Sequence, residues 1–297
     1  MAERTASRWA ADIRYILRQV FAEREALPVD VAAVAMELSR HWFPDDPVSA
    51  VTGDNLPGFD GALIPDTTRR KGWLILYNDR IESPGRIAFT LGHEFGHYLQ
   101  HRARSPKGFH CKGEDFVRWD PAYRQLENEA NVFAAGLLMP LDDFRMQVPA
   151  RDEVDFEMLG ACADRYGVSL IAAALRWLEY TLRRAVLVLS REGFVLWARA
   201  SETAFKSGLF IKTAGRPPVE IPQESPAVHA VSAVLRERHS AAHHDHVWFA
   251  EECRELILPS ERYDFTISLL LFSNTLPDWE TQQANRAWGL GRSLPTD

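Results

Sequence analysis

A histidine-rich stretch, LGHEFGHYLQH at residues 91–101, limits the fold of this 297-residue chain more than any other segment. It follows Ser83, a natural N-cap, and Pro84, which suits the first position of a helix because its missing N–H is not needed there. The sequence therefore predicts a helix that begins near residue 83 and buries one stripe of side chains. The stripe recurs every four positions and consists of Ile87, Leu91, Phe95 and Leu99.

Two histidines of this helix, His93 and His97, are four residues apart and so project from the same face. Both imidazoles can reach one ion, because zinc takes nitrogen ligands at about 2.0–2.1 Å and this spacing allows that without bending the helix. Glu94 lies beside His93 at the edge of that face, where it can take a proton from water at an open coordination position. The alternative is a solvated helix face with nothing bound.

A catalytic zinc site usually has three protein ligands and a water, so a third ligand must come from another segment. The best source is ENEANVFAAGLLMP, residues 127–140, in a second predicted helix. Glu127 and Asn131 are one turn apart there, so Glu127 can bind the metal while Asn131 orients one of the other ligands. Small residues would let this helix pack close to the first one; they are Ala130, Ala134 and Ala135.

Three alternatives remain open at this site. Glu127 can instead be a surface carboxylate that stabilises the early part of its helix. Glu129 projects from a different side of the same helix and is the weaker candidate for the third ligand. His101 continues the four-residue ladder of histidines, as a ligand, as a support for a ligand or as a surface residue.

The bulk properties are those of an ordinary globular protein. The formal net charge of −7 argues against a general nucleic-acid binder, which needs a basic surface to neutralise phosphates. The N-terminus lacks the uninterrupted apolar core of a secretory signal, and the apolar runs are far shorter than the roughly 18 residues of a membrane span. Three cysteines without CxxC spacing fit reduced thiols better than disulfides. We therefore expect a cytoplasmic protein with no membrane association.

The two stretches FTLGHEFGHYLQH and LENEANVFAAGLLMP resemble the ImmA/IrrE family of metallopeptidases. The likeness covers about residues 25–145 and extends more loosely to about residue 183. It implies a zinc- or manganese-dependent endopeptidase whose substrates are helix-turn-helix repressors, cleaved in response to phage-related or DNA-damage signals. Carried over residue by residue, it makes His93, His97 and Glu127 the metal ligands and Glu94 the general base.

The predicted fold class is α+β, in three parts. Residues 1–145 would form a mainly helical, zincin-like peptidase domain with a small sheet, and residues 146–183 a helix-turn-helix-like region. Residues 184–297 would form a mixed α/β domain. Family members with long C-terminal regions carry a GAF-like sensor there, so we expect a sensor or dimerisation domain on layout alone. A homodimer is compatible with this arrangement.

Apolar runs predict five strands in the last third of the chain, interrupted by one helix, AVHAVSAVLRER. The runs are RAVLVLS, FVLWARAS, GLFIKTA, HVWFA and DFTISLLLF. By contrast, residues 43–64 read as turns and residues 102–120 as polar and irregular. Helices are also predicted near DFEMLGACADRY and SLIAAALRWLEYTLRR. The second offers Ala, Ile and Leu where a recognition helix carries Arg, Asn or Gln, so direct DNA binding is not expected.

Other histidines are given simpler roles. The cluster at residues 243–246, HHDH, lacks helical spacing and is predicted to be a solvated loop rather than a second metal site. His110 and Cys111 are predicted to be a core or loop pair rather than an inhibitory ligand. The donor that would stabilise a tetrahedral oxyanion stays open. Its candidates are Tyr98, His101, His110 and Tyr123.

Together these patterns predict a cytoplasmic, zinc-dependent endopeptidase, with manganese as the alternative metal, and the resemblance implies that it cleaves a helix-turn-helix repressor in a stress or phage-type response. The alternatives are a non-cleaving, metal-bound sensor or anti-repressor that acts by binding its partner, and the protease of a toxin–antitoxin pair. Glu94→Gln distinguishes cleavage from binding, because a protein that only binds should tolerate this change.

Overall fold

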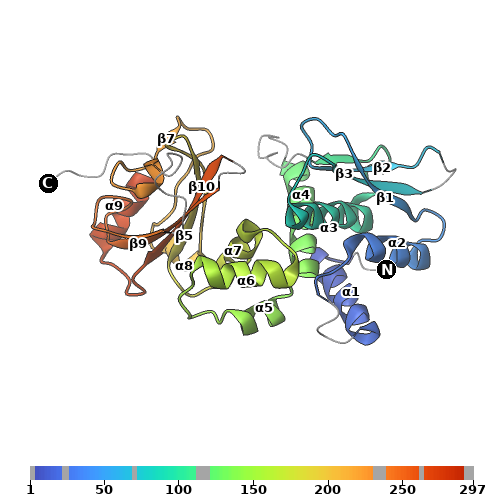
Figure 1. Ribbon diagram of the computed structural model, residues 1–297, viewed down its shortest axis with the longest axis horizontal. Coiled ribbons are helices and arrows are strands. Elements are labelled where there is room, and N and C mark those ends of the chain that lie inside the picture. Colours follow the sequence, from blue (N-terminus) through green and yellow to red (C-terminus); the bar gives the residue numbers. More distant parts are fainter. Residues whose placement is uncertain are drawn as a thin grey trace. The chain divides into compact units, whose positions relative to one another are not determined.

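A computed structural model describes residues 4–21, 27–68, 72–111, 121–229, 239–260 and 264–290 (Figure 1). The chain forms two compact units, one from the described residues of 1–144 and 161–169 and the other from those of 145–160 and 170–297. Helices occur with a sheet in both units, which confirms the predicted α+β class. The division into domains at residues 145 and 183 stays a prediction.

The first unit is built around a four-stranded sheet of order β1-β3-β2-β4, in which β1 runs parallel to β3 and the other pairs are antiparallel. The strands are β1 (Val48–Asp54), β2 (Gly61–Pro65), β3 (Trp73–Asn78) and β4 (Phe109–Cys111). The helices are α1 (Ala6–Val20), α2 (Val31–Trp42), α3 (Pro84–His101) and α4 (Pro121–Leu138). Two shorter helices, α5 (Leu141–Gln147) and α6 (Phe156–Tyr166), contribute residues to both units.

The central element of this unit is α3, the helix predicted from the histidine stretch. It contacts β2 and β3 and also α4, and Figure 1 shows it between the sheet and the other helices. Because it is covered on several sides, every residue from Thr90 to Leu99 is buried, whereas Ile87 is only half-buried. The predicted single apolar stripe was therefore too narrow a description of how this helix packs.

The second unit contains a six-stranded sheet of order β7-β6-β5-β10-β9-β8, antiparallel throughout. Its strands are β5 (Ala185–Arg191), β6 (Phe194–Ala200), β7 (Val219–Glu220), β8 (His239–His243), β9 (Cys253–Ser260) and β10 (Phe265–Phe272). Its helical segments are α7 (Leu170–Leu178), α8 (Glu202–Lys206), a 3-10 turn (Pro226–His229) and α9 (Trp279–Gly289). A core that includes Val186, Trp248 and Leu270 packs together in this unit, and α7 contacts β5 and β6.

Several predicted elements were wrong in this unit. GLFIKTA and HVWFA are not strands, although Leu209 and Trp248 within them are fully buried in the core. An apolar run indicates that its residues are buried, but a buried segment can be irregular as well as a strand. The strand β9 was missed because Arg254 and Glu255 interrupt its apolar pattern. Most of the predicted helix AVHAVSAVLRER lies outside the described residues.

Three strands of the first unit were also missed by the sequence-based prediction. The segment predicted as turns contains β1 and β2, and the segment predicted as irregular contains β4 in its described part. Glycine and proline in these stretches favoured a turn assignment, but β2 is paired on both sides, to β3 and to β4. Pairing with distant strands thus decided the structure where local propensity did not.

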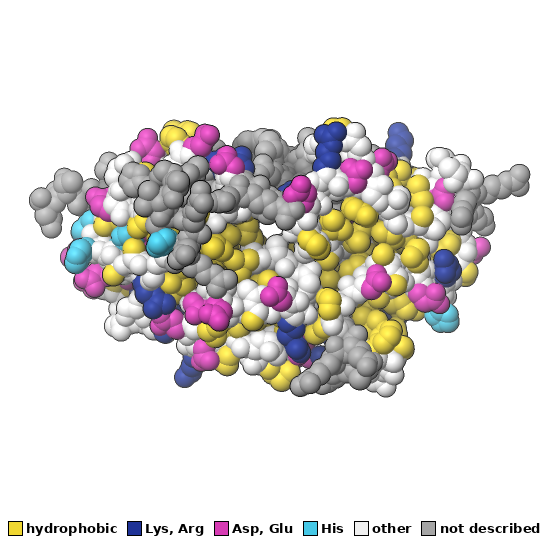
Figure 2. Space-filling view, in the orientation of Figure 1, with side chains coloured by type: hydrophobic (Ala, Val, Ile, Leu, Met, Phe, Trp, Pro, Cys, Tyr) yellow, Lys and Arg dark blue, Asp and Glu magenta, His cyan; other side chains and the backbone are white. Residues whose placement is uncertain are grey.

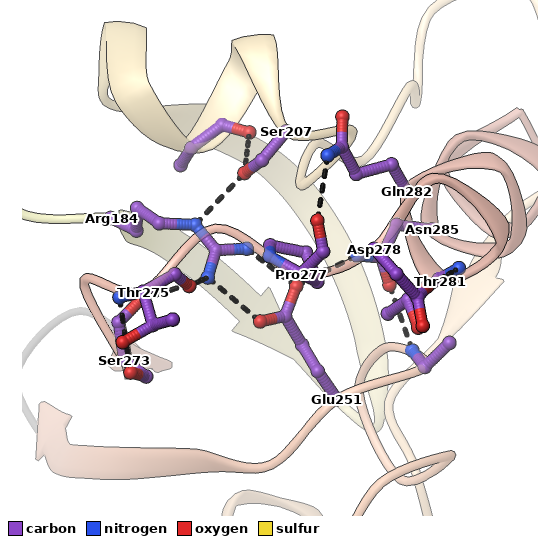
Figure 3. A network of polar contacts seen from close by, with 12 residues as sticks. Arg184, Ser207, Glu251, Ser273, Thr275, Pro277, Asp278, Thr281, Gln282 and Asn285 are labelled. Atoms are coloured by element: carbon purple, nitrogen blue, oxygen red, sulfur yellow. Dashed lines mark hydrogen bonds and ion pairs between the residues drawn. The ribbon is translucent and has the colours of Figure 1, made fainter.

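A buried ion pair joins five parts of the second unit (Figure 3). Arg184, at the start of β5, donates from Nη1 to Glu251 Oε2 at 2.8 Å and from Nε to Ser207 Oγ at 3.0 Å. Its Nη1 also donates to the carbonyl oxygens of Ser273 and Thr275, at 2.8 and 3.1 Å. From α9, Asn285 Nδ2 donates to Glu251 Oε1 at 2.8 Å. The strand, two loops and two helices are therefore joined through one guanidinium and its carboxylate.

No single helix in the described ranges is long and apolar enough to cross a membrane, although α6 and α7 taken together as a bent pair meet the same criterion of length and composition. Hydrophobic side chains do reach the surface of both units in the view of Figure 2. The most exposed of the large described ones are Met146, Val20, Tyr15, Leu276, Trp279 and Phe205. Tyr15 and Val20 both belong to α1 and the others come from different segments, and none is a residue of the site described below.

Candidate metal centre

The helix that carries the histidines begins as the sequence predicts. Ser83 caps α3 by accepting a hydrogen bond from the backbone N–H of Arg86 at 3.3 Å, and Pro84 occupies the first position. For the second helix, the sequence predicts Asp120 as the N-cap and Pro121 in the first turn; Asp120 lies outside the described residues, and α4 starts at Pro121. Local sequence therefore sets where the first of the two site helices begins.

Small residues on both helices bring α3 and α4 together. A Cβ added to Gly92 would lie 3.2 Å from Ala134 Cβ, and one added to Gly96 would lie 3.2 Å from Ala130 Cα. The alanines were predicted to have this role, whereas the two glycines were overlooked although they are spaced i, i+4 inside the histidine motif. The close approach places side chains of α4 directly opposite the histidine face of α3.

Three donor atoms meet at that contact. His93 Nε2 lies 3.0 Å from His97 Nε2 and 3.2 Å from Glu127 Oε2, and His97 Nε2 lies 3.4 Å from Glu127 Oε1. A tetrahedral zinc ion with bonds of about 2.0–2.1 Å holds its ligand atoms about 3.3–3.4 Å apart. The two nitrogens and the carboxylate thus fit one ion. Among the described residues, His93, His97 and Glu127 are the group of three potential ligands whose donor atoms lie close enough together to hold one metal ion.

Hydrogen bonds behind the two imidazoles orient them. His93 Nδ1 is 2.9 Å from Asn131 Oδ1, which is the supporting role that the sequence predicts for Asn131. An amide oxygen only accepts, so Nδ1 of His93 carries the hydrogen and its Nε2 faces the cluster. On the other side, His97 Nδ1 is 3.0 Å from His101 Nδ1, and its ring stacks on Phe109 with 4.4 Å between ring centroids. Both rings are held by packing as well as by hydrogen bonds.

Burial and mutual contact set the charges of the cluster. Burial, together with the neighbouring His93, lowers the pKa of His97 to about 4, so His97 is neutral at pH 7. Burial alone would raise the pKa of Glu127, but its contacts with His93 and His97 outweigh burial and the pKa falls well below its usual value. For His93 the lowering by burial is likewise outweighed by Glu127, and its pKa is raised. Glu127 therefore stays negatively charged at pH 7, and a cation at the cluster would meet that charge.

Glu94 is fully buried on the side of α3 that faces β2. A Cβ added to Gly61, the first residue of β2, would lie 2.8 Å from Glu94 Oε1 and 2.5 Å from Thr90 Cγ2. The absence of a side chain at residue 61 therefore leaves the space that the Glu94 carboxylate occupies. This requirement for glycine could not be read from the sequence, where Gly61 belongs to a segment predicted as turns.

We expect Gly61→Ala to disturb Glu94 without removing any donor atom. The added methyl overlaps Thr90 and Glu94, so the variant should unfold more easily by about 1–3 kcal/mol, as overpacked cores do. Urea unfolding of the variant and the wild type measures this difference. Gly160→Ala is the matched control, because a Cβ there meets nothing within 4 Å and should stabilise α6 by about 1 kcal/mol. Equal stability of Gly61→Ala and wild type would contradict the steric argument.

The other candidates from the sequence are placed elsewhere. Tyr98 donates its hydroxyl hydrogen to the carbonyl of Asp46 at 2.9 Å, so it is engaged away from the cluster. Tyr123 is half-buried one turn before Glu127 on α4 and stays a candidate oxyanion donor. The side chains of His110 and Cys111 lie outside the described residues. His243 was predicted wrongly as a solvated loop residue: it is buried at the end of β8 and lies 2.7 Å from Glu255 Oε2 through its Nε2.

Residues 51–178 match the family model described as Peptidase_M78, the IrrE N-terminal-like domain. This range contains α3 and α4 whole, and with them His93, Glu94, His97 and Glu127. No curated protein matches the chain. The match confirms the resemblance found from the sequence.

Proposed function

Because residues 51–178 carry an IrrE N-terminal-like domain of the Peptidase_M78 family, and with it a metallopeptidase-type function, we propose that the protein is a zinc-dependent endopeptidase. The observation that carries the proposal is the triangle of His93 Nε2, His97 Nε2 and Glu127, with edges of 3.0–3.4 Å, beside the buried Glu94. Imidazole ligands favour zinc over manganese, which remains the alternative metal.

In this proposal His93, His97 and Glu127 hold the ion, which when bound would polarise the scissile carbonyl and lower the pKa of a water toward 7. Glu94 accepts the proton of the attacking water and delivers it to the leaving amine. Glu94 is fully buried, so bulk water is kept from its carboxylate. The carboxylate occupies the space that the absence of a side chain at Gly61 leaves. Asn131 keeps the His93 ring in the orientation that presents Nε2.

The proposed substrate is a helix-turn-helix repressor, and cleavage would release the genes that it silences in a stress or phage-type response. The resemblance to the ImmA/IrrE family supports this choice. Residues 184–297 would supply the sensor or dimerisation function, and the antiparallel sheet and hydrophobic core that they form support this proposal. Action in the cytoplasm follows from the same proposal, since such repressors act there.

Removal of the ligand carboxylate tests the metal centre. The purified wild type should bind one zinc ion tightly. Glu127→Gln should weaken zinc binding by more than the about 10–100-fold that is lost when a residue supporting a metal ligand is substituted. Isothermal titration of zinc and of manganese into metal-free protein measures both affinities. Glu37→Gln is the control, because Glu37 is an exposed residue of α2 paired only at the surface with Arg40.

Two results would count against the proposal in different ways. Equal zinc affinity in Glu127→Gln and the wild type would remove Glu127 from the ligand set. A wild type that binds no ion tightly would remove the metal centre itself. If the centre is as proposed, chelation should also abolish peptide-bond cleavage, and added zinc should restore it in the wild type but not in Glu127→Gln.

A further inference from the structure

Behind His97, two more side chains continue a line of hydrogen bonds toward the surface. His97 Nδ1 lies 3.0 Å from His101 Nδ1, and His101 Nε2 lies 2.9 Å from Glu129 Oε2. The His101 side chain is 1% exposed and that of Glu129 is 31% exposed, so the line runs from the buried cluster to a carboxylate in contact with solvent. Gln125 Nε2 donates to the other oxygen of Glu129 at 2.9 Å and steadies it.

The direction of the hydrogen bonds follows from the end of this line. An ionised carboxylate can only accept, so His101 must place its hydrogen on Nε2, toward Glu129. A neutral His101 then offers a lone pair at Nδ1. His97 must donate its own Nδ1–H to that lone pair, which leaves a lone pair on its Nε2. The position of the hydrogen on each residue is thus set by its neighbour, and the lone pair on His97 Nε2 faces His93 and Glu127.

We propose that His101 and Glu129 are positioning residues, which hold His97 in the one neutral tautomer that can bind a metal ion through Nε2. The inference rests on the proposed function, because it assigns these residues a role toward the ion that His93, His97 and Glu127 would hold. It gives Glu129 a function in the site without making it a ligand. It also gives the two ligand histidines different supports, a neutral amide for His93 and an imidazole–carboxylate pair for His97.

The geometry argues against the two other roles open to His101. As a ligand it would have to aim a nitrogen at the donor cluster, but Nδ1 meets Nδ1 of His97 and Nε2 meets Glu129. As an oxyanion donor it would have to give up its bond to Glu129. Phe109, stacked on His97 and also near the His101 ring, restricts reorientation of both imidazoles. The role that remains is to accept from His97.

Two substitutions of His101 separate this role from simple packing. His101→Asn keeps an acceptor, because the Asn Oδ1 lies close to where Nδ1 of histidine was, whereas His101→Leu fills the space without an acceptor. We expect His101→Leu to lose about 10–100-fold in zinc affinity and His101→Asn to stay near the wild type. If His101 only fills space, the order should be the reverse, since leucine suits a buried apolar site better than asparagine.

The experiment titrates zinc alone into metal-free wild type, His101→Leu, His101→Asn, Glu129→Ala and Glu129→Gln. Glu129→Ala removes the acceptor at the end of the line and should weaken zinc binding more than Glu129→Gln, which keeps one. In the metal-free wild type, ¹⁵N shifts of His97 should place the hydrogen on Nδ1. Should His101→Leu fail to fold, the pair of substitutions at the partly exposed Glu129 and the ¹⁵N shifts still decide the question.

The possible failures are distinguishable. A wild type that binds no zinc would overturn the proposed metal centre and this inference with it. Tight binding in the wild type with unchanged affinity in His101→Leu and in Glu129→Ala would overturn the inference alone and leave the centre intact. A His97 hydrogen found on Nε2 in the metal-free protein would overturn it as well, because the line of hydrogen bonds would then run in the opposite sense.

Discussion

Glu94→Gln should lower the rate of peptide-bond cleavage by about 10²–10⁴-fold, the usual contribution of a general acid–base group. The substitution keeps the size of the side chain and removes its ability to take a proton. His93, His97 and Glu127 are untouched, so zinc affinity should remain near that of the wild type. Cleavage is measured by mass spectrometry on a panel of helix-turn-helix repressors, with an unfolded protein as a generic substrate.

Zinc binding by the same variants distinguishes a loss of the general base from a loss of the metal. Glu37→Gln, an exposed carboxylate of α2, should cleave and bind zinc like the wild type. A Glu94→Gln protein that binds zinc and still cleaves at the wild-type rate would exclude Glu94 as the general base. If the wild type binds zinc and inactivates a repressor without cutting it, and Glu94→Gln does the same, the protein is instead a non-cleaving binder.

Arg184→Met should destabilise the second unit by roughly 3–5 kcal/mol, as expected when one partner of a buried ion pair is removed. Arg184 is almost completely buried, and Glu251 would lose a bidentate partner while staying largely enclosed. Two backbone carbonyls, of Ser273 and Thr275, would lose their donor at the same time. Urea unfolding followed by far-ultraviolet circular dichroism measures the change in the free energy of unfolding.

The same strand offers the matched control. Arg191, at the other end of β5, is exposed and lies 3.9 Å from the carboxylate of Asp264, so Arg191→Met should change stability by about 0–1 kcal/mol. Equal effects of the two substitutions would mean that the Arg184 network contributes no more than a surface pair. A double substitution, Arg184→Met with Glu251→Leu, should recover much of the loss, because no buried charge is then left unpaired.

The clustering of His93, His97 and Glu127 could be predicted from the sequence because its signals are local. The i, i+4 spacing of His93 and His97 is fixed by helix geometry, and the one-turn spacing of Glu127 and Asn131 is fixed in the same way. The pairing of His101 with Glu129 joins two helices at positions that no single-helix spacing relates, and it was found only in the structure. The need for glycine at residue 61 was missed for the same reason, because the atoms that exclude a side chain there belong to a helix distant in the sequence.

The same distinction explains the errors in the fold. Helices with good caps, such as α3, were predicted to within a few residues, and so were β5 and β10, which are continuous apolar runs. Strand β2 is made by its pairing with β3 and β4 and contains glycine and proline that favour turns. Strand β9 carries Glu255, a buried carboxylate that accepts hydrogen bonds from His243, Trp248 and two serines. A charged residue in a core strand is stable only with those partners, and a single sequence does not reveal them.

The chain leaves the first unit after Phe144, returns to it for Ala161–Ser169 and leaves again. The returning segment is needed there: Tyr166 donates to Asp143 at 2.7 Å, and a side chain at Gly85 would overlap the backbone of Val168. A fragment ending near residue 145 would therefore lack part of its own core. The unit that contains the candidate metal centre is therefore not a simple N-terminal fragment, and a truncated protein should keep the chain through about Ser169 if this unit is to fold.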